Sequence, residues 1–174
     1  MYSKVKVADH PVHPMLIAFP VAFYTGALAG FAVYTANAHQ FWLNAAIALS
    51  IVGAGGAVLA ALPGFIDLVF GVPRGSQAKV AGFAHGALNV TALGLFIAAS
   101  VIYVGNWNGP PTGSTLGLAL SAAGVAVTFS AGALGWMLVQ TYHVGIRLTH
   151  RQEEDETSVQ QAPALTVVRH RRAS

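Results

Sequence analysis

Histidine is the residue type through which this chain could do chemistry. The chain has no cysteine, which removes disulfides, thiolate ligands and cysteine nucleophiles. The sequence shows no pair of catalytic acids, no phosphate-binding glycine loop and no nucleophile elbow, so it indicates no enzyme class. Imidazoles bind haem iron and several transition-metal ions. Four of them stand beside or inside apolar runs: His10, His13, His85 and His143.

The segment His10-Pro11-Val12-His13-Pro14 directly precedes the first apolar run. A residue before proline is pushed out of the α region, so we predict that both histidines lie in extended chain ahead of the helix, with Pro14 in its first turn. Residues i and i+3 of such a segment lie roughly 9 Å apart, too far for both to bind one metal at ~2 Å. His13 is therefore the better ligand candidate and His10 stays nearer water. The alternative is that both are plain interfacial residues.

His85 lies inside the third apolar run, roughly 8 Å from its start at ~1.5 Å per residue. Ionisable groups at this depth usually face the bundle interior and mark a site. Asn89 is four residues further on and therefore points the same way. Two interpretations stay open: a ligand or proton relay, or a neutral histidine bonded to Asn89 or a carbonyl. His143 ends the fourth run, where it either reaches water at the helix C-terminus or joins His85.

Asp67 is the only acid between the first apolar run and the C-terminal tail. Three structural roles are open for it: an ion pair with Arg74 or Lys79, the cap of a short interfacial helix, or the orientation of a histidine through its second N–H. In a metal site it would instead be a ligand beside the imidazoles.

The composition requires lipid around most of the chain. Hydrophobic residues make up 55% and charged residues only 9% of the 174 residues, against roughly 25% charged residues in soluble domains. About 20 apolar residues cross a bilayer, and four runs without charge qualify: 15–36, 41–62, 80–104 and 116–142. Turn signals separate them, including Pro63-Gly64 through Gly75. We predict an all-α membrane four-helix bundle over residues 1–150 and a polar, disordered tail over 151–174.

The basic residues predict the orientation. All nine Lys and Arg residues fall before the first run, between the second and third, or after the fourth. The positive-inside rule then places both termini of this multi-pass protein in the cytoplasm. This topology gathers the polar candidates at the cytoplasmic face: His10, His13, Asp67, His85, Asn89 and His143.

Several ordered motifs resemble the bacterial membrane family DUF2231. They are HPVHPMLIAFPVAF, GFIDL with Asp67, AHGALN with His85 and Asn89, and SAGALGWMLVQTYHVGIRL with His143. The resemblance covers about residues 9–148 and departs only in the run Gln140 to His143. It implies four membrane spans, a place in the cytoplasmic membrane of a bacterium and little chemistry, because the family's function is unknown. Fusion of some relatives to Rieske-type domains hints at electron transfer, although this chain cannot hold a Rieske cluster without cysteine.

Three hypotheses follow. The first is haem b between His85 and either His13 or His143, with a slot lined by Gly82, Gly86, Gly132 and Gly135. The second is a transition-metal ion held by imidazoles and Asp67. The third is a structural or accessory membrane subunit whose histidines are only hydrogen-bonded. The expected partners are the bilayer and a redox or membrane-complex protein. Glycine motifs such as Gly26-x-x-x-Gly30 also leave a homo-oligomer open, and nucleic acid is not expected.

Overall fold

The computed structural model describes residues 3–146, 149–152, 154 and 158. Nearly all of the tail predicted to be disordered lies outside these residues. The described elements, in chain order, are β1 (Lys6–Val7), β2 (His10–Pro11), α1 (Val12–Leu16), α2 (Ala18–Asn37), α3 (Gln40–Ile66), the π-helix η1 (Asp67–Gly71), α4 (Gln77–Tyr103), the 3-10 helix η2 (Val104–Asn106) and α5 (Thr115–Gln140).

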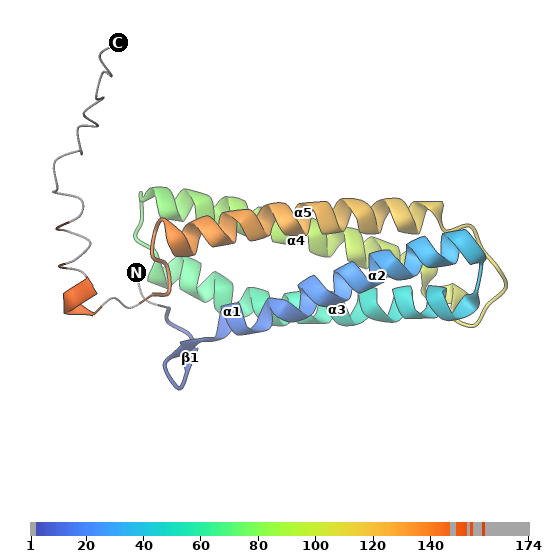
Figure 1. Ribbon diagram of the computed structural model, residues 1–174, viewed down its shortest axis with the longest axis horizontal. Helices are drawn as coiled ribbons and strands as arrows, with labels where there is room; N and C mark the ends of the chain where they lie inside the picture. The colour runs from blue at the N-terminus through green and yellow to red at the C-terminus, as the bar shows by residue number, and fades with distance from the viewer. Residues whose placement is uncertain (1–2, 147–148, 153, 155–157, 159–174) are drawn as a thin grey trace, which may run out of the picture.

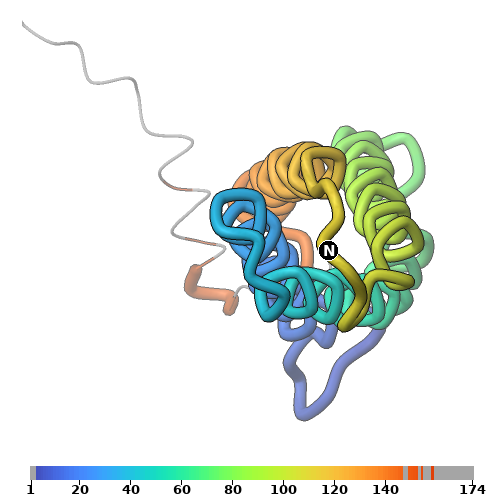
Figure 2. Tube along the Cα trace, turned by 90° about the vertical axis from the view of Figure 1, so that its right-hand side faces the viewer, coloured from blue at the N-terminus to red at the C-terminus, as the bar shows by residue number. Residues whose placement is uncertain are grey.

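Four apolar spans confirm the predicted all-α membrane fold. They run over Val12–Asn37, Gln40–Gly71, Gln77–Asn106 and Thr115–Gln140. Their bounds are close to the predicted ones except at the end of the second span, which was predicted at residue 62. The spans lie side by side around one axis (Figures 1 and 2), with α2 between α3 and α5, and α4 on the opposite side. Large apolar side chains such as Val101 and Trp136 remain about 70% exposed (70% and 69%). Such surfaces match a hydrocarbon solvent.

The bundle has two distinct ends. We call the end where α1 and α4 begin and where η1 and α5 end the histidine end, and the opposite one the loop end (Figure 1). The loop end is filled by aromatic side chains. Tyr24 stacks on Phe96 with ring centroids 3.7 Å apart and planes 2° apart, and Phe31 meets Tyr103 edge-on at 5.2 Å. These rings hold the two helical hairpins together at that end.

The predicted turn at Pro63-Gly64 is wrong, because α3 continues through both residues to Ile66 and then into η1. Proline removes one N–H from a helix, and in a membrane bundle neighbouring groups compensate for that loss. The helix ends instead where Lys79 reaches back from α4. Its ammonium group donates to the carbonyls of Leu68, Val69 and Val72. The π-type segment therefore has partners for its last carbonyls.

Buried positions recur along the chain at a constant spacing. The spacing is 72 positions between α2 and α4, and 71 between α3 and α5. The pairs are Pro20 with Ala92, Tyr24 with Phe96, Ala27 with Ala99, Phe31 with Tyr103, Ser50 with Ser121, Gly53 with Gly124, and Ala60 with Ala131. Both hairpins begin at the histidine end, so the two halves repeat in parallel and not inverted. The bundle is thus a pseudo-two-fold arrangement of two similar hairpins.

Glycines at helix crossings serve this packing. A Cβ at Gly30 would lie 3.0 Å from the Cβ of Ala46 on α3, and one at Gly26 would lie 3.0 Å from Leu49. The Gly26-x-x-x-Gly30 motif therefore brings α2 against α3 inside the bundle. This is the intramolecular role of small residues in membrane helices.

Candidate functional site

His13 lies within α1, whereas we predicted extended chain ahead of the helix. The helix begins at Val12, after Pro11 in extended conformation (φ −61°, ψ 128°). Proline is tolerated in the first helical turn, where backbone N–H groups have no intrahelical acceptor, so Pro14 does not exclude His13 from the helix. The imidazole crosses to α3, where its Nδ1 lies 2.8 Å from the carbonyl oxygen of Ala60.

Gly64 forms the seat of this ring. A Cβ built at Gly64 would lie 2.7 Å from Nδ1 and 2.9 Å from Cε1 of His13. Real Cβ atoms essentially never approach so closely, so only glycine lets the ring lie flat against α3 at this point. One turn of α3 therefore provides both the carbonyl and the space for the imidazole.

His85 repeats this arrangement in the second hairpin. Its Nδ1 lies 2.8 Å from the carbonyl oxygen of Ala131 on α5. A Cβ at Gly135 would lie 3.1 Å from its Cε1. The residue whose carbonyl accepts from the imidazole and the glycine are four residues apart in both hairpins. Each hairpin thus presents one imidazole, held in the same way by its second long helix.

The hydrogen bonds decide the tautomer of both rings. A carbonyl oxygen only accepts, so the proton of each neutral imidazole is on Nδ1 and the lone pair is on Nε2. An N–H held by a backbone carbonyl is the usual second interaction of a metal-ligating histidine. In its neutral form each ring therefore has the tautomer that leaves Nε2 available to a metal.

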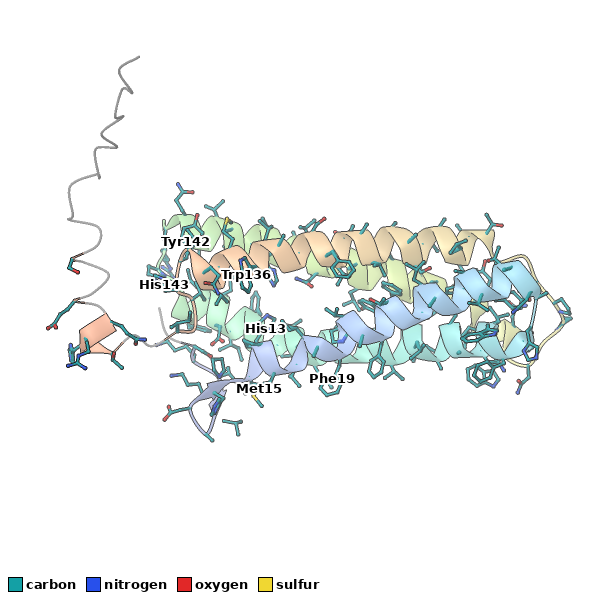
Figure 3. All side chains as sticks on the ribbon, in the orientation of Figure 1. His13, Met15, Phe19, Trp136, Tyr142 and His143 are labelled. Carbon is teal, nitrogen blue, oxygen red and sulfur yellow. The ribbon has the colours of Figure 1, made fainter. Side chains whose placement is uncertain are left out.

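The two imidazoles meet across the pseudo-two-fold axis. Their ring centroids are 6.1 Å apart and their planes are 88° apart. In Figure 3, His13 lies on the side of α1 that faces α4 and α5, whereas Met15 and Phe19 lie outward and are 58% and 53% exposed. His13 and His85 precede Tyr24 and Phe96 by the same eleven positions, or about three helical turns. The histidine pair therefore continues the line of paired rings along the axis.

This separation can be compared with two opposed imidazoles on one metal atom. A bond of ~2.0–2.1 Å, plus ~1.1 Å from the bonding nitrogen to the ring centre, puts each centroid roughly 3.1 Å from the metal. Two axial ligands then have centroids roughly 6.2 Å apart. The observed 6.1 Å agrees with this value. The pair is spaced as axial ligands would be.

The four glycines expected to line a slot have different surroundings. Gly135 contacts His85, whereas Gly82 packs on Leu68 in the α3–α4 contact. A Cβ at Gly86 or Gly132 would meet nothing within 4 Å. Gly86 is half-buried and Gly132 is exposed, so Gly132 does not line a slot between the rings.

Among the residues that the structure describes, Asp67 has none of the three structural roles that the sequence suggested for it. Its carboxylate accepts from Ser3 Oγ at 2.7 Å, from the Lys4 amide at 2.5 Å and from the Val5 amide at 3.2 Å. It therefore ties the N-terminal segment to the end of α3. Within the described part of the chain, no three His, Cys or acidic side chains lie close enough to hold a metal ion together.

His10 and His143 lie apart from the imidazole pair. His10 is exposed, and its Nδ1 lies 2.7 Å from the Ala8 carbonyl within the β1–β2 hairpin. His143 has a left-handed backbone (φ 52°) in the turn after α5, and Figure 3 shows it beyond the helix end. Asn89, by contrast, contacts His85. Its amide nitrogen lies 3.2 Å from Nε2 and 2.9 Å from the His85 carbonyl oxygen.

A family model described as a predicted membrane protein, DUF2231, matches residues 9–148. The chain belongs to the DUF2231 family. The matched region contains the whole histidine pair and all four spans, so this geometry lies within the DUF2231 domain itself. Neither a curated protein nor a solved structure matches the chain.

Sequence reasoning missed the groups that hold the rings, namely Ala60, Gly64 and Ala131. A backbone carbonyl acceptor cannot be recognised from the residue type, because every residue has one. The repeat was nevertheless a detectable signal. His13 and His85, like Tyr24 and Phe96, are separated by 72 positions, and Gly64 and Gly135 by 71. An internal comparison of this DUF2231 chain would have marked His13 and His85 as equivalent positions, although equivalence alone does not bring two rings together.

Proposed function

We propose that this DUF2231 protein binds one haem b between His13 and His85 and transfers electrons at the membrane. The observation that carries the proposal is the imidazole pair, with centroids 6.1 Å apart and both Nδ1 protons directed to backbone carbonyls. Two ligands from facing hairpins are the usual way in which helical bundles hold a cofactor. The paired geometry supports His13 over His143 as the partner of His85.

The number of ligands favours haem over a bare metal ion. Two imidazoles complete the coordination of an iron whose other four ligands are porphyrin nitrogens, whereas an isolated ion needs three or more protein ligands. Among the described residues there is no such group, and the Asp67 carboxylate is occupied by three hydrogen bonds from the N-terminal segment. A metal site that includes Asp67 is therefore the weaker proposal.

The protein's own groups would tune and hold the cofactor. When bound, haem supplies one-electron chemistry. The carbonyls of Ala60 and Ala131 orient the rings and raise the basicity of Nε2, which favours the more highly charged iron. The half-buried Gly86 adjoins open space, and Gly64 and Gly135 bring the rings close to the helix backbones.

We further propose that the histidine end faces the cytoplasm of a bacterium. The charges support this, because the described Lys and Arg residues precede α1, lie between η1 and α4 or follow α5: Lys4, Lys6, Arg74, Lys79 and Arg151. The loop end has none among the residues described. The positive-inside rule assigns such an end to the cytoplasm. A cytoplasmic or membrane-bound redox protein would then be the partner.

The test is an absorption spectrum of the full chain, produced with sufficient haem and purified in detergent. We expect a Soret band, sharp α and β bands after reduction with dithionite, and one haem per chain by pyridine haemochrome. His13→Ala and His85→Ala should each lose most of the haem. His10→Ala and His39→Ala are matched controls that should retain it.

Two results would contradict the proposal. One is wild-type protein without a Soret band, and the other is full haem content in His85→Ala. The accessory-subunit hypothesis predicts something different. In that case His85→Ala lowers the unfolding temperature of a colourless protein, because the loss of a buried hydrogen bond leaves the Ala131 carbonyl without this donor.

A further inference from the structure

The two imidazoles differ at the atom that would bind a metal. Nε2 of His85 lies 3.2 Å from the Asn89 amide nitrogen, which also donates to the His85 carbonyl. In the first hairpin the equivalent position, 72 residues earlier, is Ile17, which has no side-chain donor. No hydrogen bond reaches Nε2 of His13 from the residues that the structure describes. Only His85 thus has a competitor for its lone pair.

His13 also differs from His85 in the contacts around it, although both rings have the same carbonyl hydrogen bond. Its glycine seat is closer, since a Cβ at Gly64 would lie 2.7 Å from the ring against 3.1 Å at Gly135. The residue before it is tied down as well, because the Val12 amide donates to the Val5 carbonyl at 3.1 Å. Val5 is in turn held by Asp67. The chain around His13 has anchors on α3 that the continuous helix around His85 does not share.

We propose that His13 is the permanent axial ligand and that His85 is exchangeable, so that the site binds a small neutral diatomic molecule on the His85 side. This inference rests on the haem proposed above. With haem bound, His85 would be the ligand that is released, its Nε2 would then accept the Asn89 N–H, and the small molecule would bind on that side. No electron or proton is transferred in this step. Asn89 lowers the cost of displacing the imidazole by giving its lone pair another partner.

The surroundings define the class of ligand. Asn89 is exposed on the lipid side of α4. Its neighbour Val90 is 67% exposed. Gly86, where a Cβ would meet open space, lies about one turn before Asn89. A molecule that reaches Asn89 from the lipid side passes through hydrocarbon. Lys79 is the only charged residue of α4, and it lies near the start of that helix. Neutral diatomic gases dissolve in hydrocarbon, whereas anions such as cyanide do not. Carbon monoxide is the appropriate probe.

The experiment measures carbon monoxide binding to the dithionite-reduced protein by stopped flow. In Asn89→Leu, which keeps the side-chain size and removes the donor, we expect binding to the haem to become about five- to tenfold slower, the range expected for the loss of one hydrogen bond. Thr91→Val is the matched control, because Thr91 is also exposed on α4 and bonds only to the Ala87 carbonyl. It should bind at the wild-type rate.

A second variant tests the same idea in the other hairpin. Ile17→Asn introduces the missing amide beside His13, and we expect it to speed up carbon monoxide binding. Equal rates in wild type, Asn89→Leu and Ile17→Asn would overturn the inference and leave the haem proposal intact. A wild-type protein without a Soret band would overturn both.

Discussion

At the scale of single residues, the site depends on groups without chemistry of their own. His13 and His85 are positioned by two backbone carbonyls and two glycines. Glycine is required at Gly64 because of the space it leaves and not because of its backbone angles. A side chain there would push the imidazole off α3 and break its bond to Ala60.

Gly64→Ala should therefore damage the site. The added Cβ would lie 2.7 Å from His13 Nδ1, and such overpacking costs ~1–3 kcal/mol. We expect a lower unfolding temperature in detergent and a lower ratio of Soret to protein absorbance. Gly55→Ala is the control on the same helix, since Gly55 is exposed and its Cβ would meet nothing within 4 Å. A Gly64→Ala protein that matches Gly55→Ala in both measurements would show that the seat does not matter.

At the scale of elements, the end of α3 holds in place the chain at the start of the first hairpin. Ala60 binds the ring of His13, and Asp67, two turns further, binds the segment that leads to it. The short β1–β2 hairpin turns through Ala8 and Asp9, both at positive φ (48° and 62°). Positive φ at both central positions is typical of a tight hairpin turn. This turn returns the chain so that Val5 lies opposite Val12.

Asp67→Ala should release the N-terminal segment. It removes the acceptor of three hydrogen bonds, and a hydrogen bond to a charged group contributes ~1.5–3 kcal/mol. Hydrogen exchange should show loss of protection at the Lys4 and Val5 amides. Ser3→Ala removes only one of the bonds and should leave those two amides protected. Unchanged protection in Asp67→Ala would mean that other contacts hold the segment.

At the scale of the whole molecule, pseudo-two-fold symmetry brings equivalent ring residues of the two hairpins together in pairs, and these pairs follow one another along the axis. The order from the histidine end is His13 with His85, Tyr24 with Phe96, and Phe31 with Tyr103. Aromatic packing closes the loop end, and the two imidazoles with small neighbours occupy the other. The site is therefore nearer one membrane surface than the other, so the orientation of the bundle decides which compartment it serves.

Single cysteines can report this orientation cleanly, because the chain has none of its own. Gln77 is exposed at the histidine end and His39 at the loop end. Gln77→Cys and His39→Cys therefore each place one accessible thiol at a known end. If the histidine end is cytoplasmic, a membrane-impermeant maleimide should label His39→Cys in spheroplasts and reach Gln77→Cys only after lysis. The reverse pattern of labelling would invert the proposed topology.

The sequence by itself determined that lipid surrounds most of the chain, how many spans cross it, and nearly all the bounds of these spans. These follow from local properties, since each span must be apolar over its own length. The span end at Pro63-Gly64 was wrong because the compensating groups, such as the Lys79 ammonium, come from another helix. The family was also readable from the ordered motifs, as the match over residues 9–148 confirms.

Only the tertiary structure decided which histidines meet. The sequence left His13 and His143 as equal partners for His85, and it offered Asp67 as a ligand. The structure pairs His13 with His85, places His143 beyond α5 and commits Asp67 to the N-terminal segment. The physical reason is that this pairing depends on rotation about the bundle axis and on backbone carbonyls. Neither is encoded in the type of any one residue.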